Sequence, residues 1–595
     1  MTSSVLVALT IGLPWLGALC ISFGVRDRSE RAQHALAILF AVTSGLAALA
    51  LLPTAANATI LRIPVGGVFG DFTFNPDGLG VFLASVATVV GSLAVIFSVD
   101  YMRGEKQLGR YYALVLLFIG AMAGLALTGS ILLLFIFWEI TALCSYALIS
   151  FYNDDPKAVA GGIKALIMTQ IGGVGLLVGA LIVYAYLGGY DISLLIEKAN
   201  TLPPGVLNVL AFGFLIAAAA KSAQFPFQTW LPDAMEAPTP VSALIHAATM
   251  VNAGVYLLAR FYPAFAPVPG WTMAVMIVGM LSALLTAIMA LVATDLKRVL
   301  AYSTVSQLGY MVYAVGAGSI LASQFHLLSH AVFKALLFLG AGAVIHAIGT
   351  RDLRKMGGLG RQMPLIRTTF IIGALALVGI PILNGFWSKE MVLEAGLSGG
   401  PAWIWIVMLI GAGLTALYTF RVVWMVFFGA PRGDDNHGAT HAHDATHAMR
   451  FALVVLAVGA LTTWLLIGPF SGLIASSFGA VAAGQPHELS LTEMIAEVVT
   501  APATGIALIV IALAIGAAWW RRDKLTALGN RLGWLSRMAT DSFGFEWINR
   551  TIVRGTQAIA GGLRVTQTGA LNWNILGIVG GLIVVLAILA MGVAR

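Results

Sequence analysis

The feature that most constrains this chain is its series of long apolar runs, separated by short breaks and carrying very few charges. Of its 595 residues, 59% are hydrophobic and only 10% are charged, whereas about a quarter of a soluble domain is charged. A transmembrane helix needs roughly 20 apolar residues in succession. The composition therefore excludes a soluble globular domain and predicts an all-α protein that crosses the membrane many times.

Polar, glycine and proline breaks divide the chain into about 16 expected membrane spans. These spans are 5–23, 35–52, 79–98, 112–128, 131–151, 162–187, 206–230, 240–262, 271–293, 298–321, 323–349, 366–394, 403–428, 450–470, 501–519 and 572–592. No charge-rich linker separates them, so we expect one membrane domain. Its parts are N-terminal helices over 1–111, five-helix units over 112–262 and 271–428, and C-terminal helices over 450–595.

The basic residues are distributed unevenly between the two sides of these spans. Of 33 Lys and Arg residues, 24 follow odd-numbered spans, four lie on the opposite side and five fall inside spans. Cytoplasmic loops of membrane proteins carry the excess of Lys and Arg. We therefore expect a multi-pass protein of the inner (plasma) membrane with both termini on the outer side. The net charge of +7 reflects this topology and does not indicate nucleic-acid binding.

Eight charged residues lie inside expected spans, where a lipid-facing charge costs about 2.5–3.5 kcal/mol. Such residues face the protein interior and commonly mark routes for ions or protons. They are the main functional signal in the sequence. The basic members are Lys164, Lys221, Lys334, Lys389 and Arg421, and the acidic members are Glu139, Glu390 and Glu394.

Glu139 and Lys221 form the first candidate pair. Glu139 lies in the middle of a span, in FWEITALCSY, and Lys221 precedes Pro226 and Pro232 in AAAAKSAQFPFQTWLPDAM. Proline breaks are tolerated in membranes where they line protein or water. A buried carboxylate needs a nearby cation, and a buried lysine can carry a proton reversibly. A static ion pair that only joins two helices is the alternative.

Histidine and lysine residues recur on later spans. His246 lies in the span after the broken one, and His326, His330 and Lys334 are spaced four residues apart in SQFHLLSHAVFKALLFLG. This spacing places three titratable groups in one stripe along a helix, which predicts a proton relay. The alternatives are a core role for His246 and a structural polar seam or a zinc site for the stripe. No matching third metal ligand is evident, so we expect no bound metal.

A second span is also interrupted by proline. In VGIPILNGFWSKEM, Pro381 and Gly385 come just before Lys389 and Glu390. Paired interrupted helices at corresponding positions are typical of inverted repeats in transporters. We therefore expect two inverted five-helix repeats, spans four to eight and nine to thirteen, in which Lys389 corresponds to Lys221.

Three other features have narrower implications. Residues 521–570 are basic and partly amphipathic, which is typical of a helix along a membrane surface. Cys20 and Cys144 lie in apolar runs, which excludes a disulfide framework and an iron–sulfur centre. No phosphate-binding loop or haem motif is present, and we expect no cofactor. A histidine-rich stretch in an expected cytoplasmic loop is interpreted as a solvated loop, with proton collection or metal binding as alternatives; it contains His437, His441, His443 and His447.

Residues from about 110 to 430 resemble the antiporter-like subunits of respiratory complex I, of multisubunit Mrp sodium/proton antiporters and of membrane-bound hydrogenases. The motifs that carry the resemblance are FWEITALCSY, AKSAQFPFQTWLPDAMEAPTPVSALIHAAT, HLLSHAVFKALLFLGAGAVIH and GFWSKE. The resemblance implies two proton half-channels joined by a central hydrophilic axis, and a lateral helix and last span after residue 500. It places on that axis Glu139, Lys221, His246, His326, His330, Lys334, Lys389 and Glu390.

The sixth span bears on the branch of this family. Large complex I members tend to carry an Arg-Val-Gly-Asp-like element there, whereas this chain has Gln170 and Gly173 in KALIMTQIGGVGLLVGA. In that respect the sixth span resembles the large Mrp subunit or the hydrogenase branch. The leading hypothesis is a proton-translocating subunit of a multisubunit Mrp-type cation/proton antiporter, with other membrane subunits as partners and protons and sodium as transported ions. Two alternatives stay open: a proton-pumping subunit of a complex I-like NADH:quinone oxidoreductase or membrane-bound hydrogenase, and a membrane subunit that couples proton flux to inorganic carbon uptake.

Overall fold

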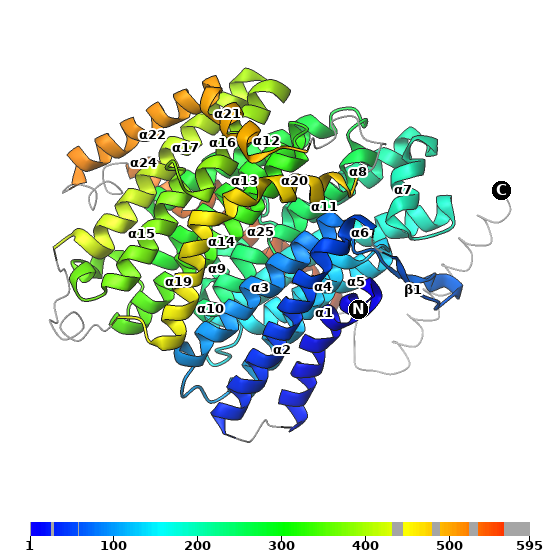
Figure 1. Cartoon of the computed structure of the whole chain (residues 1–595), viewed down its shortest axis with the longest axis horizontal. Coiled ribbons are helices and arrows are strands. Elements are labelled where there is room, and N and C mark those ends of the chain that lie inside the picture. The colour runs from blue at the N-terminus through cyan, green and yellow to red at the C-terminus, as the bar shows by residue number, and fades with distance from the viewer. Residues whose placement is uncertain are drawn as a thin grey trace. The chain divides into compact units, whose positions relative to one another are not determined.

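The computed structural model describes residues 2–24, 29–57, 59–430, 444–478, 488–522 and 533–564. Residues up to Ser536 form one compact unit, in which most helices lie side by side in a bundle (Figure 1). Residues from Arg537 onward form a second unit. Thirteen helices among the described residues are long and apolar enough to cross a membrane. The predicted all-α, multi-pass fold is therefore confirmed.

The N-terminal part contains three long helices and a small hairpin. The hairpin pairs β1 with β2 in antiparallel register, with Leu61 opposite Phe74. The elements are α1 (Ser3–Leu19), α2 (Glu30–Leu51), β1 (Leu61–Ile63), β2 (Phe72–Phe74) and α3 (Gly78–Tyr101).

The first expected five-helix unit contains two interrupted helices. The chain leaves helical geometry after α8. The span over Thr239–Phe265 changes from α-helix to one wider turn of π-helix and back to α-helix. The elements are α4 (Leu108–Leu127), α5 (Ile131–Ile149), α6 (Pro156–Leu187), α7 (Ile192–Lys198), α8 (Pro204–Lys221), α9 (Trp230–Asp233), α10 (Thr239–Ala243), η6 (Leu244–Ala248) and α11 (Asn252–Phe265).

The second expected unit surrounds a long central helix, α14 (Ile320–Ile348). This helix contacts elements from all four parts of the chain, including α3, α10, α13, α16 and α19. The other elements of the unit are α12 (Trp271–Val292), α13 (Leu296–Gly316), α15 (Pro364–Val378), α16 (Asn384–Gly399) and α17 (Ala402–Val423). The inverted relation between the two units stays a prediction.

After α17, the compact unit that ends at Ser536 continues with a C-terminal part. Its elements are α19 (His447–Thr462), η10 (Thr463–Leu466), α20 (Ile467–Ala475), α21 (Leu491–Thr500) and α22 (Pro502–Trp520). Two further helices are α24 (Gly533–Thr540) and α25 (Phe545–Arg564). Helix α25 is amphipathic, with one apolar and one polar face, as predicted for the lateral segment. Its position along a membrane surface stays a prediction.

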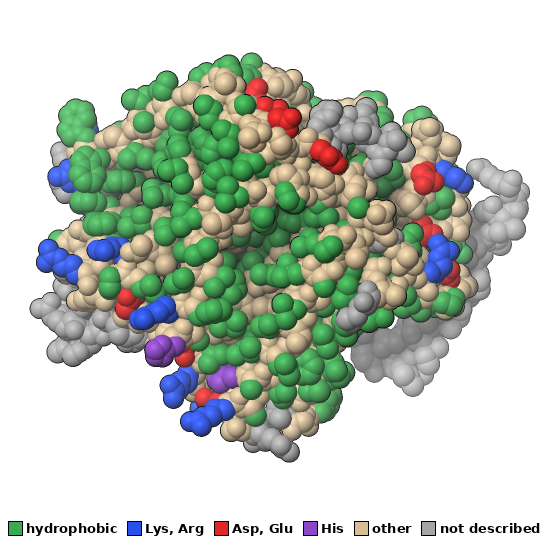
Figure 2. Space-filling model, viewed as in Figure 1, with side chains coloured by type: hydrophobic (Ala, Val, Ile, Leu, Met, Phe, Trp, Pro, Cys, Tyr) green, Lys and Arg blue, Asp and Glu red, His purple; other side chains and the backbone are tan. Residues whose placement is uncertain are grey.

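The observed helices account for fifteen of the expected spans. Polar α13 and the interrupted α15–α16 pair occupy two expected spans but are not among the thirteen long apolar helices. The sixteenth, 572–592, lies outside the described residues, as do His437, His441 and His443. Which side of the membrane the termini face stays a prediction. Charged side chains on the face shown in Figure 2 are confined to the edges of the bundle.

Short polar side chains determine where several helices begin. Each accepts a hydrogen bond from a backbone N–H in the first turn, where no carbonyl of the same helix is available. The residues with this role are Asp77 before α3, Ser130 before α5, Asp155 before α6, Asp295 before α13 and Ser319 before α14.

Small residues allow α12 and α13 to pack backbone against backbone. A Cβ atom on Gly279 would lie 2.6 Å from the Gly309 carbonyl oxygen, and the reverse distance is also 2.6 Å. Glycine at both positions permits this approach, as is common between membrane helices. The contact fixes α13, which carries polar side chains toward the centre of the bundle.

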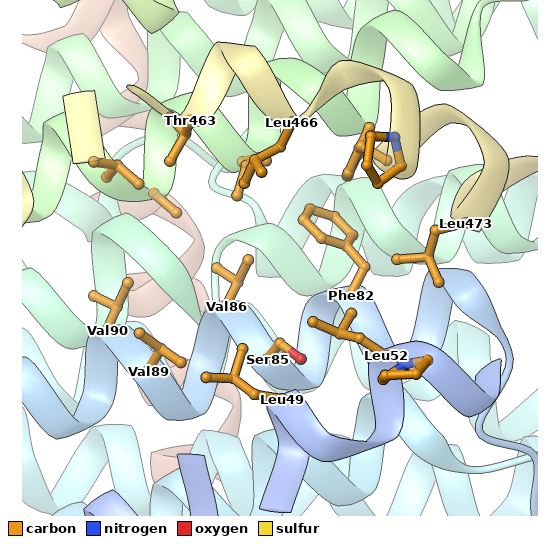
Figure 3. Close-up of a pocket in the computed structure, with 16 residues that line it drawn as sticks. Leu49, Leu52, Phe82, Ser85, Val86, Val89, Val90, Thr463, Leu466 and Leu473 are labelled. Carbon is orange, nitrogen blue, oxygen red and sulfur yellow. The ribbon is translucent and has the colours of Figure 1, made fainter. Parts of the chain in front are cut away.

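An apolar groove of about 540 Å³ lies between α2 and α3 on one side and η10 and α20 on the other (Figure 3). Two hydroxyl side chains in its lining, Ser85 and Thr463, donate hydrogen bonds to backbone carbonyl oxygens, those of Ala48 at 3.3 Å and Gly459 at 2.8 Å. The groove therefore offers hydrocarbon rather than free polar groups and is distinct from the polar centre described below.

Asp77 and Arg260 form a buried ion pair whose loss should destabilise the fold. Arg260 Nη2 donates to Asp77 Oδ1 at 2.8 Å, and the two side chains are only 7% and 13% exposed. Since removing one partner of a buried pair leaves an uncompensated charge, Asp77→Asn should lower the free energy of unfolding by about 3–5 kcal/mol. Chemical unfolding of the purified protein in detergent would measure the loss.

The matched control is Asp71→Asn, because Asp71 pairs at 3.6 Å with an exposed residue, Arg62, and is itself only partly buried. An exposed pair contributes about 0–1 kcal/mol. Equal losses for the two variants would contradict the importance of the buried pair.

Candidate functional site

The first group of site residues surrounds Lys221, the last residue of α8. Lys221 is fully buried, and its Nζ donates a hydrogen bond to the backbone oxygen of Trp138 at 2.7 Å. The same nitrogen lies 4.8 Å from the centroid of the Trp138 ring, within range of a cation–π interaction. Lys221 therefore contacts α5 at the residue that precedes Glu139.

Glu139 itself is half-buried, and its hydrogen-bond partner is Gln170 of α6. Gln170 Nε2 donates to Glu139 Oε2, while Oε1 has no hydrogen-bond partner within the described chain. A Cβ atom on Gly173, one turn further along α6, would lie 2.4 Å from Oε1. The sequence predicted a buried carboxylate at Glu139, and the structure shows it half-buried. The sequence also predicted a cation nearby, and Lys221 is held one residue away, on the carbonyl of Trp138.

The predicted break after Lys221 is present. Residues 222–229 are non-helical, and the Gln224 Nε2 atom bridges Ser222 O (3.0 Å) and Val305 O of α13 (3.3 Å). Trp230 Nε1 donates to Ala220 O at 3.0 Å, and this carbonyl in the last turn of α8 also accepts from Ala223 N at 3.4 Å. The break is therefore a stable part of the bundle.

His246 lies at an interruption that the sequence did not predict. It occupies η6, the wider turn between α10 and α11, and is fully buried. Neither ring nitrogen has a hydrogen-bond partner among the described residues. Its ring centroid lies 6.4 Å from that of Trp230 and 5.8 Å from that of Phe338. His246 thus lies between the break after α8 and the central helix α14.

The predicted stripe on α14 faces the protein interior. His326, His330 and Lys334 are all fully buried. The His326 Nδ1 atom lies 3.0 Å from Ser388 Oγ on α16, and Nε2 lies 3.1 Å from Gln307 Oε1 on α13. His326 therefore connects α14 with the residue that precedes Lys389.

Lys334 continues the stripe toward α13. Its Nζ donates hydrogen bonds to Ser303 Oγ and, at 3.4 Å, to Leu300 O. No carboxylate lies within ion-pair distance of Nζ in the part of the chain that the structure describes. The ammonium is held by a hydroxyl and a carbonyl oxygen alone.

Lys389 repeats the arrangement found at Lys221. Its Nζ donates to the backbone oxygen of Val378, the last residue of α15, at 3.2 Å, and lies 5.3 Å from the centroid of the Tyr310 ring. Each lysine thus lies at an interrupted helix and contacts one backbone carbonyl and one aromatic face. The next residue, Glu390, is 1% exposed, and neither carboxylate oxygen has a hydrogen-bond partner among the described residues.

The uncharged partners of these groups were missed by the sequence reasoning. Ser303, Gln307, Ser388 and Gln224 hold lysines, histidines or the broken backbone in place. A signal existed for the first two, because α13 reads AYSTVSQLGYMVY and is more polar than its neighbours. Charged residues alone do not indicate the uncharged side chains that complete the site.

Two of the basic residues inside expected spans lie away from this group. Lys164 pairs with Asp233 at 2.8 Å near the end of the break. Arg421 donates to the oxygens of Leu291 (2.9 Å) and Ala293 (2.8 Å), and these carbonyls end α12. Both residues join helices, and the central group contains the remaining three lysines.

A family described as "NADH:quinone oxidoreductase/Mrp antiporter, TM" matches residues 128–415, which include all eight predicted site residues. A second family, "NADH-Ubiquinone oxidoreductase (complex I), chain 5 N-terminus", matches residues 63–112. The chain is 36% identical to NADH-quinone oxidoreductase subunit L of Escherichia coli (strain K12), over 98% of this chain and 99% of that one. The chain belongs to the antiporter-like subunit family of these oxidoreductases and Mrp antiporters.

Other relatives of this antiporter-like subunit come from several kinds of complex. It is 37% identical to Na(+)/H(+) antiporter subunit A1 of Staphylococcus aureus (strain JH9), over 68% of this chain and 53% of that one. The Mrp complex from Dietzia sp. DQ12-45-1b contains a similar structure, with TM-score 0.81 and 30% identity over 100% of this chain and 63% of that one. A chain of the archaeal membrane-bound sulfane sulfur reductase is also similar, with TM-score 0.71 and 26% identity over 83% of this chain and 99% of that one.

The contact between Gly173 and Glu139 gives a direct test of the site. In Gly173→Ala, the added methyl group should push the Glu139 carboxylate away from Gln170. Because a hydrogen bond to a charged group is worth about 1.5–3 kcal/mol, we expect proton transport by the reconstituted complex to fall by about tenfold or more. The fold should persist, since only the end of a side chain must move.

Gly516→Ala on α22 is the matched control, because a Cβ atom there would have no neighbour within 4 Å. Equal transport by the two variants would show that the position of the Glu139 carboxylate does not matter.

Proposed function

We propose that this antiporter-like subunit moves protons across the membrane through its buried titratable residues, as part of a multisubunit complex. The proposal rests on the surroundings of Lys221, Lys334 and Lys389, each of which is at most 1% exposed. Carbonyl, hydroxyl and aromatic groups hold these lysines, and no carboxylate lies within ion-pair distance of them in the described residues. Uncompensated charges at this depth are rare and usually functional. A lysine in such surroundings can release and regain a proton.

The contacts of these residues support a continuous order. Lys221 lies at the start of the break, Trp230 at its end, and His246 contacts Trp230 and Phe338. Phe338 follows Lys334 by one turn of α14, and His326 on the same helix bonds to the residue before Lys389. The order is therefore Lys221, His246, Lys334, His330, His326, Lys389 and Glu390.

Water is needed to complete such a relay, and the site has polar atoms that would bind it. Both nitrogens of His246, both polar atoms of Gln228 and Nε2 of Gln307 are buried without a protein partner in the described chain. Buried polar groups are nearly always satisfied by protein or by ordered water. Water at these positions would connect side chains that are too far apart for direct transfer.

Glu139 fits a modulating role in this scheme. It lies beside the carbonyl that holds Lys221, and Gln170 fixes one of its oxygens. A change in charge at Glu139 would alter the free energy of proton binding at Lys221 through a Coulombic interaction. One charge moved across 100 mV corresponds to about 2.3 kcal/mol, which a change of one or two pKa units can match.

We further propose a cation/proton antiporter complex of the Mrp type as the context. The support is Gln170 and Gly173 at the Glu139 contact, the Staphylococcus aureus antiporter relative, and the likeness to a chain of the Mrp complex over the whole of this chain. A complex I-like proton pump is the second candidate, favoured by the identity to subunit L over nearly the full length of both chains. No observation favours inorganic carbon uptake.

Lys221→Ala should abolish proton transport while the complex still assembles, because the relay loses its first carrier. Transport would be measured with a pH-sensitive dye in vesicles containing the purified complex. Lys198→Ala is the control, since Lys198 is an exposed lysine on α7. Unchanged transport by Lys221→Ala would rule out the relay.

The type of complex can be tested separately. An Mrp-type complex should acidify or alkalinise vesicles in response to a sodium gradient without NADH, and should co-purify without iron–sulfur subunits. Proton movement that requires NADH and quinone, with iron–sulfur subunits in the preparation, would instead establish the complex I-like alternative.

A further inference from the structure

A cavity of about 390 Å³ lies next to the Lys389 end of the relay. It is lined by the turn between α13 and α14, by α16, by α21 and by the start of α22. Its charged lining consists of three carboxylates, those of Glu390, Glu394 and Glu497, and the described lining contains no Lys, Arg or His. We call this cavity the acidic vestibule.

The three carboxylates lead from the surface to the interior. Glu497 on α21 is exposed, Glu394 on α16 is half-buried and Glu390 is 1% exposed. Glu390 and Glu394 are four residues apart on one helix and therefore share a face. The series ends at Glu390, the residue that follows Lys389 in the chain. The vestibule therefore joins the relay to the surface of the bundle.

The inner wall carries oxygen atoms that lack a protein partner. Both carboxylate oxygens of Glu390, Oε2 of Glu394 and the hydroxyl oxygen of Thr504 have no hydrogen-bond partner in the described residues. Thr504 is 4% exposed. A buried carboxylate without a partner is strongly unfavourable, and carboxylate and hydroxyl oxygens are suitable ligands for small hard cations.

The outer wall is formed by α21, and hydrogen bonds at the N-terminus of this helix stabilise it. Ser490 and Glu493 form a capping box at the start of α21, with Ser490 N donating to Glu493 Oε2 at 2.8 Å and Glu493 N to Ser490 Oγ at 3.2 Å. Met494 and Val498 of the same helix are buried. The backbone of Glu497, which lies between them, is thereby positioned at the mouth of the vestibule.

We propose that the acidic vestibule is a binding port for a small monovalent cation, at which sodium ions and protons compete for the same carboxylates. No three acidic, histidine or cysteine side chains in the described residues converge closely enough to chelate a metal ion. The cation therefore keeps part of its water and is held mainly by the field of the three carboxylates. The inference rests on the proposed cation/proton antiport and names the place where the two ions meet.

The test uses vesicles that contain the intact purified complex. The sodium chloride concentration that gives half-maximal proton movement would be measured for the unaltered protein, Glu497→Gln and Glu394→Gln. We expect each substitution to raise this concentration several-fold, and choline chloride to reduce the difference for Glu497→Gln because exposed charges are screened by salt. Glu30→Gln, at an exposed position of α2, controls for the loss of one negative charge.

Each other outcome overturns a specific claim. If both variants match the unaltered protein while Lys221→Ala is inactive, the relay stands and the vestibule is not a cation port. If Glu497→Gln and Glu394→Gln shift only the pH dependence of transport, the vestibule exchanges protons but does not bind sodium. If proton movement is independent of sodium in all forms, the competition and the antiport function both fail.

Discussion

The structure depends on how a positive charge can be held in the middle of a membrane bundle. Most carbonyl oxygens in a helical bundle already accept backbone hydrogen bonds, so a buried ammonium has few acceptors. At Lys389 the interruption supplies one, because Nζ donates to the carbonyl of Val378 at the end of α15. Lys221, itself at the end of α8, instead shares the carbonyl of Trp138 within the continuous helix α5. The interruption therefore provides the acceptor for Lys389 and the position of Lys221.

The same principle explains which parts of the site could be predicted from the sequence. Proline residues mark the breaks near Lys221 and Lys389, and the four-residue spacing on α14 places His326, His330 and Lys334 on one buried face. These are local signals, which depend only on backbone chemistry and helical periodicity. The positions of the helices in the described residues could be predicted from the apolar runs for the same reason.

The remaining parts depend on contacts between distant segments. The wider turn at His246 contains no proline or glycine, and the bond from Gln170 to Glu139 joins residues on different helices. Arg421 could not be separated from the central lysines by sequence, because its role depends on the carbonyls that end α12. Such partners become visible only when tertiary packing is known.

We propose that the buried titratable residues act as one series rather than as two independent routes. Lys334 is the decisive residue, because it lies on α14 between the His246 and Lys389 contacts. The most direct measurement is voltage-driven proton flux into vesicles that contain the complex with Lys334→Met, which preserves much of the side chain's length. A single series predicts that the flux disappears, whereas a flux of about half the original value or more would contradict it.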